Sequence, residues 1–290
     1  MTTNKYIELE DSAFFEIKGI EKNSFLQGLI TNDINKCKIN KSIYSAFLTP
    51  QGKFVADFFI AKLKNSFLFE THEKLIDELI KKLNFYKLRA DAKLDKNTKY
   101  TSLAIYDKNK LFDNLIAEGD SKIIDNGIIF IDPRKNIMGL KAFIEKTYVN
   151  DFCIKYSLQK DSLVDYDQKR IENLIPHSIL DLQINKSVLL ENNFDSINAI
   201  DWEKGCYIGQ EITARMRYRS LLKKSLTKII IIKGNIISGD EIFFENKKIG
   251  NVSSFNNNIG LAMLRIEEAK KAYDNNINLK TKNAEIRVNF

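Results

Sequence analysis

Two β-rich runs, SIYSAFLT and KFVADFFIAKL, are separated by Pro50, Gln51 and Gly52, and this feature constrains the fold most. Proline fixes one backbone angle and glycine permits angles closed to other residues, so the pattern predicts a tight β-hairpin. Asp57 lies in the middle of the second run. A buried carboxylate must be paired or hydrogen-bonded. Asp57 therefore either faces solvent on an alternating strand or serves a function.

Apolar residues at helical spacing predict a helix over residues 73–84, for which Thr71 is available as a cap. A short surface helix fits GIEKNSFLQGLITNDI, which ends in the turn-forming residues Thr31, Asn32 and Asp33. The ranges 143–150 and 161–171 also favour helices. LRADAKL, residues 88–94, alternates as a strand.

The character of the chain changes after about residue 225, where short β runs are punctuated by Gly and Asn. This pattern is typical of a small β-barrel. We therefore predict two regions, residues 1–224 and residues 225–290. A chain of 290 residues with 44 % hydrophobic residues is long enough for two globular parts.

The solubility and the compartment of the protein are predicted from the lack of a long apolar run and from the charged residues. No run of about 18 apolar residues occurs, and the first residues carry Glu8, Glu10 and Asp11. We expect a cytoplasmic protein that does not enter membranes. The three cysteines are an odd number and widely spaced, which favours reduced thiols. The net charge of +7 leaves an RNA-binding role as an alternative. Because the lysines are spread along the whole chain, the charge can also reflect composition alone.

The stretch KGCYIGQEITAR places Cys206 between Gly205 and Gly209. The glycines permit tight turns on both sides of the cysteine, and the following residues, 210–217, favour a helix. Lys204 and the helix start would both favour the thiolate of Cys206. The alternative is a buried cysteine that acts as a small hydrophobic residue.

A metal site formed by this chain alone is not expected. No CxxC motif occurs, and His72 and His177 stand far from any cysteine in sequence, whereas a complete zinc or iron-sulfur site needs about three or four ligands. Cys206 could at most share a ligand shell. His177 follows Pro176 and is either a surface or capping residue or a catalytic partner of Cys206.

A basic stretch, ARMRYRSLLKKS, follows the motif and contains Arg215, Arg217, Arg219, Lys223 and Lys224. These side chains could hold a phosphate or a polyglutamate tail through forked hydrogen bonds, or simply solvate a hinge.

KGCYIGQEITAR resembles the signature of YgfZ-type folate-binding proteins, which are related to the glycine-cleavage T-protein, an aminomethyltransferase, and include mitochondrial iron-sulfur assembly factors. SFLQGLITNDI, LTPQGKFVADFFI, LRADAKL, RIENLIP, ENNFD and GNVSSF also occur in the order of that family. The resemblance spans nearly the whole chain. It implies an α+β, T-protein-like (GcvT-like) fold of three parts, with two intertwined ferredoxin-like subdomains and a C-terminal β-barrel.

The resemblance also implies a ligand and a set of site residues. The ligand is tetrahydrofolate or a derivative, for which a carboxylate suits the adjacent N–H donors of the pterin. The implied catalytic residues are Cys206, as the reactive thiol, and Lys204, as its activator. The implied folate-binding and positioning residues are Asp57, Glu172, Tyr207, Gln210, Glu211 and Arg215.

The function implied is that of a folate-binding accessory factor, expected to be a monomer, that helps assemble or repair iron-sulfur clusters. Its partners would be client or assembly proteins, including enzymes of tRNA modification, with tRNA contacted only indirectly. The alternative is a tetrahydrofolate-dependent aminomethyltransferase of the glycine-cleavage type. Whether the chain is an enzyme is left open by its sequence.

Overall fold

The computed structural model describes residues 4–106, 111–112, 114–218 and 222–290. The chain forms two compact units, each made of two segments. Unit 1 consists of Met1–Ser162 and Ser196–Gln210, and unit 2 of Leu163–Asp195 and Glu211–Phe290. The division predicted after residue 224 stays a prediction about domains, because the compact units follow a different path through the sequence.

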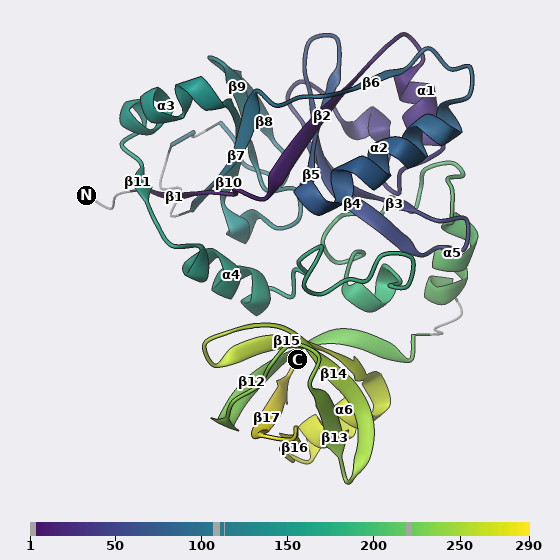
Figure 1. Ribbon diagram of the computed structural model, residues 1–290, viewed down its shortest axis with the longest axis vertical. Coiled ribbons are helices and arrows are strands. Elements are labelled where there is room, and N and C mark those ends of the chain that lie inside the picture. The colour runs from purple at the N-terminus through teal and green to yellow at the C-terminus, as the bar shows by residue number, and fades with distance from the viewer. Residues whose placement is uncertain (1–3, 107–110, 113, 219–221) are drawn as a thin grey trace. The chain divides into compact units, whose positions relative to one another are not determined.

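Unit 1 contains two sheets (Figure 1). The first has the strand order β3-β4-β5-β2-β6, and the second has the order β11-β1-β7-β10-β9-β8. The strands of the first sheet are β2 (Ser12–Lys18), β3 (Ile43–Leu48), β4 (Phe54–Lys62), β5 (Phe67–His72) and β6 (Lys93–Lys96). Those of the second are β1 (Lys5–Glu8), β7 (Tyr100–Tyr106), β8 (Ser121–Ile124), β9 (Gly127–Ile131), β10 (Leu140–Glu145) and β11 (Gln159–Lys160).

The predicted hairpin is confirmed as strands β3 and β4, which pair antiparallel with Ala46 opposite Asp57. Eight of the nine residues of β4 are buried, because the strand is covered on both faces. Helix α2 (Glu73–Lys87) packs on one face of this sheet. On the other face, aromatic side chains meet those of the second sheet, as in the edge contact of Phe14 with Phe143 at 5.0 Å.

Helix α2 begins where its spacing predicts, but a different residue caps it. Nδ1 of His72 accepts the backbone N–H of Lys74 at 3.1 Å. Thr71 instead donates its hydroxyl to the carbonyl of Asp57 at 2.8 Å and so ties β5 to β4. Unit 1 also contains the short helices α1 (Lys22–Gln27) and α3 (Val149–Lys155), and the 3-10 turns η1 (Ile34–Lys36), η2 (Asn136–Met138) and η3 (Lys146–Tyr148).

Unit 2 is built around a closed barrel, which confirms the barrel predicted from about residue 225. Its strand order is β12-β15-β14-β13-β16-β17. The strands are β12 (Lys224–Gly234), β13 (Glu241–Phe244), β14 (Lys247–Asn256), β15 (Ile259–Arg265), β16 (Leu279–Lys280) and β17 (Ala284–Asn289). Helix α6 (Ile266–Asp274) adds Ala269 and Ala272 to the barrel core.

The remaining elements of unit 2 are α4 (Leu163–Glu172), η4 (Leu190–Asn192) and most of α5 (Gln210–Tyr218). The helices predicted over 161–171 and 210–217 are thus confirmed as α4 and α5. Among the described residues, no helix has the length and apolar character needed to cross a membrane.

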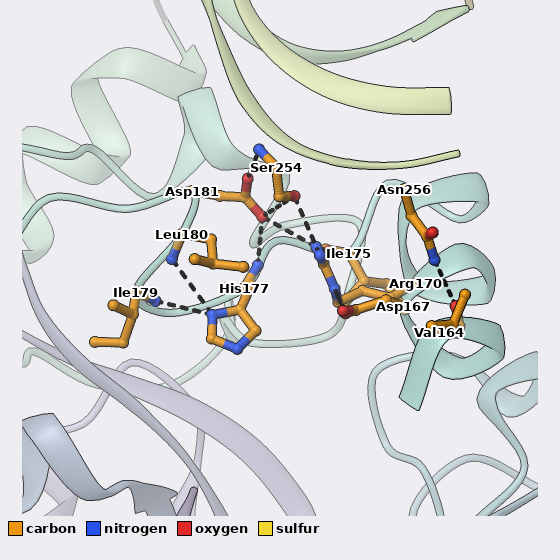
Figure 2. Close-up of polar contacts among 10 residues, drawn as sticks. All are labelled: Val164, Asp167, Arg170, Ile175, His177, Ile179, Leu180, Asp181, Ser254 and Asn256. Atoms are coloured by element: carbon orange, nitrogen blue, oxygen red, sulfur yellow. Dashed lines mark hydrogen bonds and ion pairs between the residues drawn. The ribbon is translucent and has the colours of Figure 1, made fainter. Parts of the chain in front are cut away.

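A buried ionic cluster joins α4 to barrel strand β14 within unit 2 (Figure 2). The guanidinium of Arg170 contacts the carboxylate of Asp181 at 3.0 Å and donates to the hydroxyl of Ser254 at 3.1 Å. Asp181 also accepts the backbone N–H of His177 at 2.7 Å. Because each charge has several partners, the cluster offsets the cost of burying it.

Candidate functional site

The three cysteines all lie in the described part of the chain, and they differ sharply in access. Cys206 is exposed, whereas Cys37 and Cys153 are buried at 1 % and 9 % exposure. Burial raises the pKa of both the Cys37 and the Cys153 thiol. Cys206 is therefore the thiol that unit 1 presents to solvent.

Lys204, two residues before this thiol, is buried at 8 % exposure. Its ammonium donates to three backbone carbonyl oxygens, those of Gln27 (2.9 Å), Ile30 (2.6 Å) and Asn32 (3.0 Å). Gln27 is the last residue of α1, and Ile30 and Asn32 lie in the segment that follows it. Burial lowers the pKa of Lys204 to about 8, although the carboxylates of Asp33 and Asp201 act in the opposite direction.

The residues after Cys206 are anchored to the same part of unit 1. Ile208 donates its backbone N–H to the carbonyl of Gly28 at 3.1 Å. The aromatic ring of Tyr207, which is buried, lies 5.0 Å from the ammonium of Lys204. Gly209 has φ +80°, and a Cβ there would lie 2.5 Å from the carbonyl oxygen of Thr49. This position therefore requires glycine.

Thr31 and Asn32 join the first strands of the chain to the segment before the motif. The hydroxyl of Thr31 donates to the carbonyl of Ala199 at 2.6 Å. The side-chain amide of Asn32 donates to the carbonyls of Tyr44 and Asn198, both at 2.8 Å. The segments FLQGLITND and INAIDWEKGCYIG thus form one hydrogen-bonded assembly within unit 1.

Asp201 adds an ionic contact to this assembly. Its carboxylate lies 2.6 Å from the ammonium of Lys36 and accepts the backbone N–H of Glu203 at 2.9 Å. Burial alone would raise the pKa of the Asp201 carboxyl. The Lys36 ammonium and the backbone N–H groups of Glu203 and Lys204 outweigh burial and hold that pKa below its usual value.

Asp57 is buried at 6 % exposure, and Tyr44 on the neighbouring strand donates its hydroxyl to the carboxylate. Burial, together with the negative charge of Asp57, raises the pKa of the Tyr44 phenol well above its ordinary value. Tyr44 therefore stays a hydrogen-bond donor to Asp57. The side chain of Asn32 donates to the backbone carbonyl of Tyr44, and the backbone carbonyl of Asn32 accepts from Lys204, so the residues that hold Asp57 and the motif loop are neighbours.

Two further ion pairs are buried near Asp57 and surround the ring of Phe59. Arg134 pairs with Asp132 at 2.7 Å, and Lys141 pairs with Glu70 at 3.1 Å. The two cations lie 4.8 Å and 4.1 Å from the Phe59 ring centroid. Buried charges of this density are costly. Each of these charges is therefore paired with an opposite charge within hydrogen-bond distance.

Whether this region fits a folate depends on its hydrogen-bond acceptors. A pterin ring presents adjacent N–H donors, and a buried carboxylate accepts them well. Asp57 is such a group. Glu172, the other acid predicted to hold the pterin, is exposed at the end of α4 in unit 2 and accepts the amide of Gln168 at 3.1 Å.

The predicted site residues divide between the two units. Unit 1 contains Asp57, Lys204, Cys206, Tyr207 and Gln210, and unit 2 contains Glu172, Glu211 and Arg215. Glu211 and Arg215 are exposed on α5, where their charged groups lie 3.9 Å apart. The basic stretch continues with Arg217, which lies 3.9 Å from Asp195. Arg219 lies outside the described residues.

His177 serves a local role in unit 2, which Figure 2 shows. Its ring Nδ1 accepts the backbone N–H groups of Ile179 at 3.2 Å and Leu180 at 3.3 Å. This geometry confirms the interpretation of His177 as a capping residue. Among the described residues, no group of three or more His, Cys, Asp or Glu side chains is placed to hold a metal ion.

Sequence reasoning missed Tyr44, Thr31, Asn32 and the two ion pairs around Phe59. Thr31 and Asn32 take their roles from partners far away in the sequence, because their acceptors Ala199 and Asn198 are 168 and 166 residues away. The pairs Tyr44–Asp57 and Asp132–Arg134 are closer, at 13 and two residues. The one available signal was the clustering of Thr31, Asn32 and Asp33 in a turn, which local patterns explain equally well as a helix end.

Comparisons with known proteins show what the two ends of the chain and its fold resemble. Residues 4–106 match the GCVT N-terminal domain family, and residues 224–289 match the CAF17 C-terminal beta-barrel domain family. The aminomethyltransferase T of the Bartonella henselae glycine cleavage system has a similar structure, with a TM-score of 0.80 over 100 % of this chain and 86 % of that one. At 13 % identity this likeness shows the fold alone. The predicted α+β, T-protein-like architecture with a C-terminal barrel is confirmed.

The names of the curated relatives are more specific than the descriptions of the two family models. The chain is 26 % identical to the mitochondrial "Iron-sulfur cluster assembly factor IBA57 homolog" of Dictyostelium discoideum over 78 % of its own length and 62 % of that protein. It is 29 % identical to the Neurospora crassa homolog over 77 % of its length and 53 % of that protein. With the Mus musculus factor the values are 25 %, 90 % and 78 %.

These relatives correct one prediction and leave others as they stood. The chain spans less than two thirds of the D. discoideum and N. crassa proteins. All three relatives are described as mitochondrial, which contradicts the predicted cytoplasmic location. That prediction was wrong because it rested on the lack of a long apolar run and on acidic residues near the start, and neither feature identifies a compartment. The finer assignment to the YgfZ type stays a prediction.

Proposed function

We propose that this protein is a folate-binding factor that acts in the assembly or repair of iron-sulfur clusters and presents the thiol of Cys206 to a partner protein. The observation that carries the proposal is the contrast among the thiols. Cys206 is exposed on a loop anchored by buried hydrogen bonds, whereas Cys37 and Cys153 are buried. The names of the curated relatives support the iron-sulfur role.

The role of Cys206 follows from what a single thiol can do. One cysteine cannot complete a four-ligand cluster site, but its thiolate can react with, or contribute one ligand to, a centre that a partner also holds. An exposed position makes the thiol accessible to a partner. We further propose, from the family resemblance, that the clients include enzymes of tRNA modification.

The folate proposal rests on the confirmed T-protein-like fold and on the buried Asp57–Tyr44 pair. Folate, when bound, supplies a pterin ring with adjacent N–H donors and the means to carry a one-carbon unit. Asp57 would accept hydrogen bonds from the pterin, and Tyr44, as a permanent donor, would hold the carboxylate in place.

The experiment is complementation of a strain that lacks the gene, with the activity of a cluster-dependent enzyme and the level of a cluster-dependent tRNA modification as readouts. Cys206→Ser should fail to restore both. Cys153→Ser, which removes a buried thiol instead, is the matched control and should restore both. Full rescue by Cys206→Ser would overturn the role of this thiol.

Folate binding is tested separately with the purified protein and tetrahydrofolate by anaerobic calorimetry. Loss of a charged hydrogen-bond acceptor should weaken binding of Asp57→Asn by about tenfold or more. The control is Asp33→Asn, which removes a less buried acid. Absence of binding by the wild type, or equal binding by Asp57→Asn, would contradict this part of the proposal.

The aminomethyltransferase alternative is not favoured by the curated relatives, all of which are named as assembly factors. A glycine-cleavage assay with the partner proteins of that system separates the two functions. Appreciable formation of methylenetetrahydrofolate would favour the alternative.

A further inference from the structure

The loop that carries Cys206 is held at both ends while its centre stays open. Before the cysteine, Lys204 enters a cradle of three carbonyls, and after it Ile208 donates to Gly28 at 3.1 Å. Both anchors contact the last residue of α1 or the segment 28–32 that follows it. Between them, Gly205 and Cys206 are exposed. A short loop fixed at two points has few conformations left to it.

The carbonyl cradle matches the donors of an ammonium group. A lysine ammonium has three N–H donors and no acceptor, and each donor finds one oxygen, at 2.9, 2.6 and 3.0 Å. The carbonyl at the end of a helix carries partial negative charge, which favours a cation at this place. Because Lys204 is buried, losing any one bond would leave a charged donor without a partner.

The same geometry argues against a direct hydrogen bond from Lys204 to the thiol. The three donors of the ammonium are used by backbone oxygens. The Tyr207 ring also lies against the ammonium, at 5.0 Å from its centroid. All three donors of Lys204 are therefore bound by backbone carbonyls within residues 27–32.

We infer that Lys204 is a positioning residue that fastens the Cys206 loop to the end of α1, so that the thiol is displayed at a fixed place on unit 1. The inference rests on the proposed function only in taking Cys206 as the working thiol. It also gives the FLQGLITND segment a role, because this segment supplies all three acceptors. The segment FLQGLITND supplies the acceptors, and the segment KGCYIGQEITAR supplies the donor.

The test is Lys204→Met, which keeps the length of the apolar stem and removes the donors. Native-state hydrogen exchange of the full chain should show the backbone N–H of Ile208 exchanging about tenfold faster or more, because more than one charged hydrogen bond is lost. Amides of β4 should be unchanged. The matched control is Lys36→Met, which removes a half-exposed lysine that contacts the same segment through Asp201.

A spectroscopic readout separates positioning from general loss of structure. A nitroxide attached to Cys206 of the full chain reports the motion of this loop, and the buried thiols of Cys37 and Cys153 report unfolding. Lys204→Met should sharpen the nitroxide spectrum while Cys37 and Cys153 stay unreactive. Lys36→Met should leave the spectrum as in the wild type.

Two outcomes would overturn the inference. One is unchanged exchange of Ile208 and an unchanged nitroxide spectrum in Lys204→Met, because the loop would then be held without the cradle. The other is equal acceleration of Ile208 and the β4 amides with exposure of Cys37, which would make Lys204 a general stabiliser. Neither outcome depends on complementation by Cys206→Ser, so failure of the inference and failure of the proposed function are distinguishable.

Discussion

At the scale of single residues, the site depends on polar side chains whose partners are backbone groups. Lys204, Thr31 and Asn32 all donate to main-chain carbonyls. Backbone acceptors stay in place when side chains elsewhere change, so they are dependable partners for a buried donor. Asp57 and Asp201 differ, because their carboxylates contact the side chains of Tyr44 and Lys36. The ionic contribution of Asp201 should therefore depend on pH.

We predict that Asp201→Asn lowers the free energy of unfolding by about 1 kcal/mol at pH 7, since solvent screens the half-exposed Lys36. The folded state holds the pKa of Asp201 below its usual value. The stabilisation is therefore present above the ordinary aspartate pKa of about 3.9 and is lost as pH falls through the lowered value. Urea unfolding from pH 7 down to pH 3 measures this. A difference between wild type and variant that grows on acidification would contradict the assignment.

At the scale of elements, the turn into α5 depends on one glycine, while another glycine four residues earlier is free to change. Gly209 has positive φ and lies against the backbone of Thr49. Gly205 has nothing within 4 Å of a potential Cβ. The two glycines that frame Cys206 in sequence therefore differ in what they contribute.

We predict that Gly209→Ala destabilises the protein by about 1–3 kcal/mol, because alanine is strained at positive φ and its Cβ meets a backbone oxygen. Gly205→Ala should change stability by less than about 0.5 kcal/mol. Urea unfolding followed by the fluorescence of Trp202, the single tryptophan, compares them. Equal midpoints for the two variants would show that the turn can adapt.

Local patterns predicted those elements that local forces determine. The β3–β4 hairpin, α4, α5 and the barrel each follow from periodicity and turn residues. The range 143–150 was wrongly predicted as a helix, since Phe143 lies in strand β10 and the helix α3 begins only at Val149. A short apolar run does not distinguish a buried strand from a buried helix, and the two neighbouring strands of β10 decided the outcome.

The candidate site was predictable in its most local part only. The exposed Cys206 and the buried Asp57 were both singled out from the sequence. The cradle of Lys204 was not, because its acceptors lie 172 to 177 residues away and are backbone atoms, which any residue type supplies. Sequence patterns therefore singled out candidate residues without indicating which of them lie in contact.

At the scale of the whole molecule, each unit has its own core and its own buried ionic contacts. In unit 2, the carboxylate of Asp181 receives Arg170, Ser254 and the backbone of His177 (Figure 2). In unit 1, the buried ionic contacts include the pairs Arg134–Asp132 and Lys141–Glu70. A substitution that removes one of these ionic contacts should therefore destabilise first the unit that contains it.

We predict that Arg170→Met destabilises unit 2 by about 3–5 kcal/mol, because it leaves the Asp181 carboxylate buried without its cation. Hydrogen exchange should accelerate in β14 and α4 and change much less in β3 and β4. Arg217→Met, which removes a half-exposed arginine of the same unit, serves as the control and should have little effect. Equal acceleration in both units would show that they unfold as one.

The chain passes from one unit to the other three times, after Ser162, after Asp195 and after Gln210. No single cut therefore releases either unit as a continuous polypeptide. A fragment of residues 1–162 therefore lacks the segment that carries the Cys206 loop, and a fragment of residues 211–290 contains the barrel but lacks α4 and η4 of the same unit.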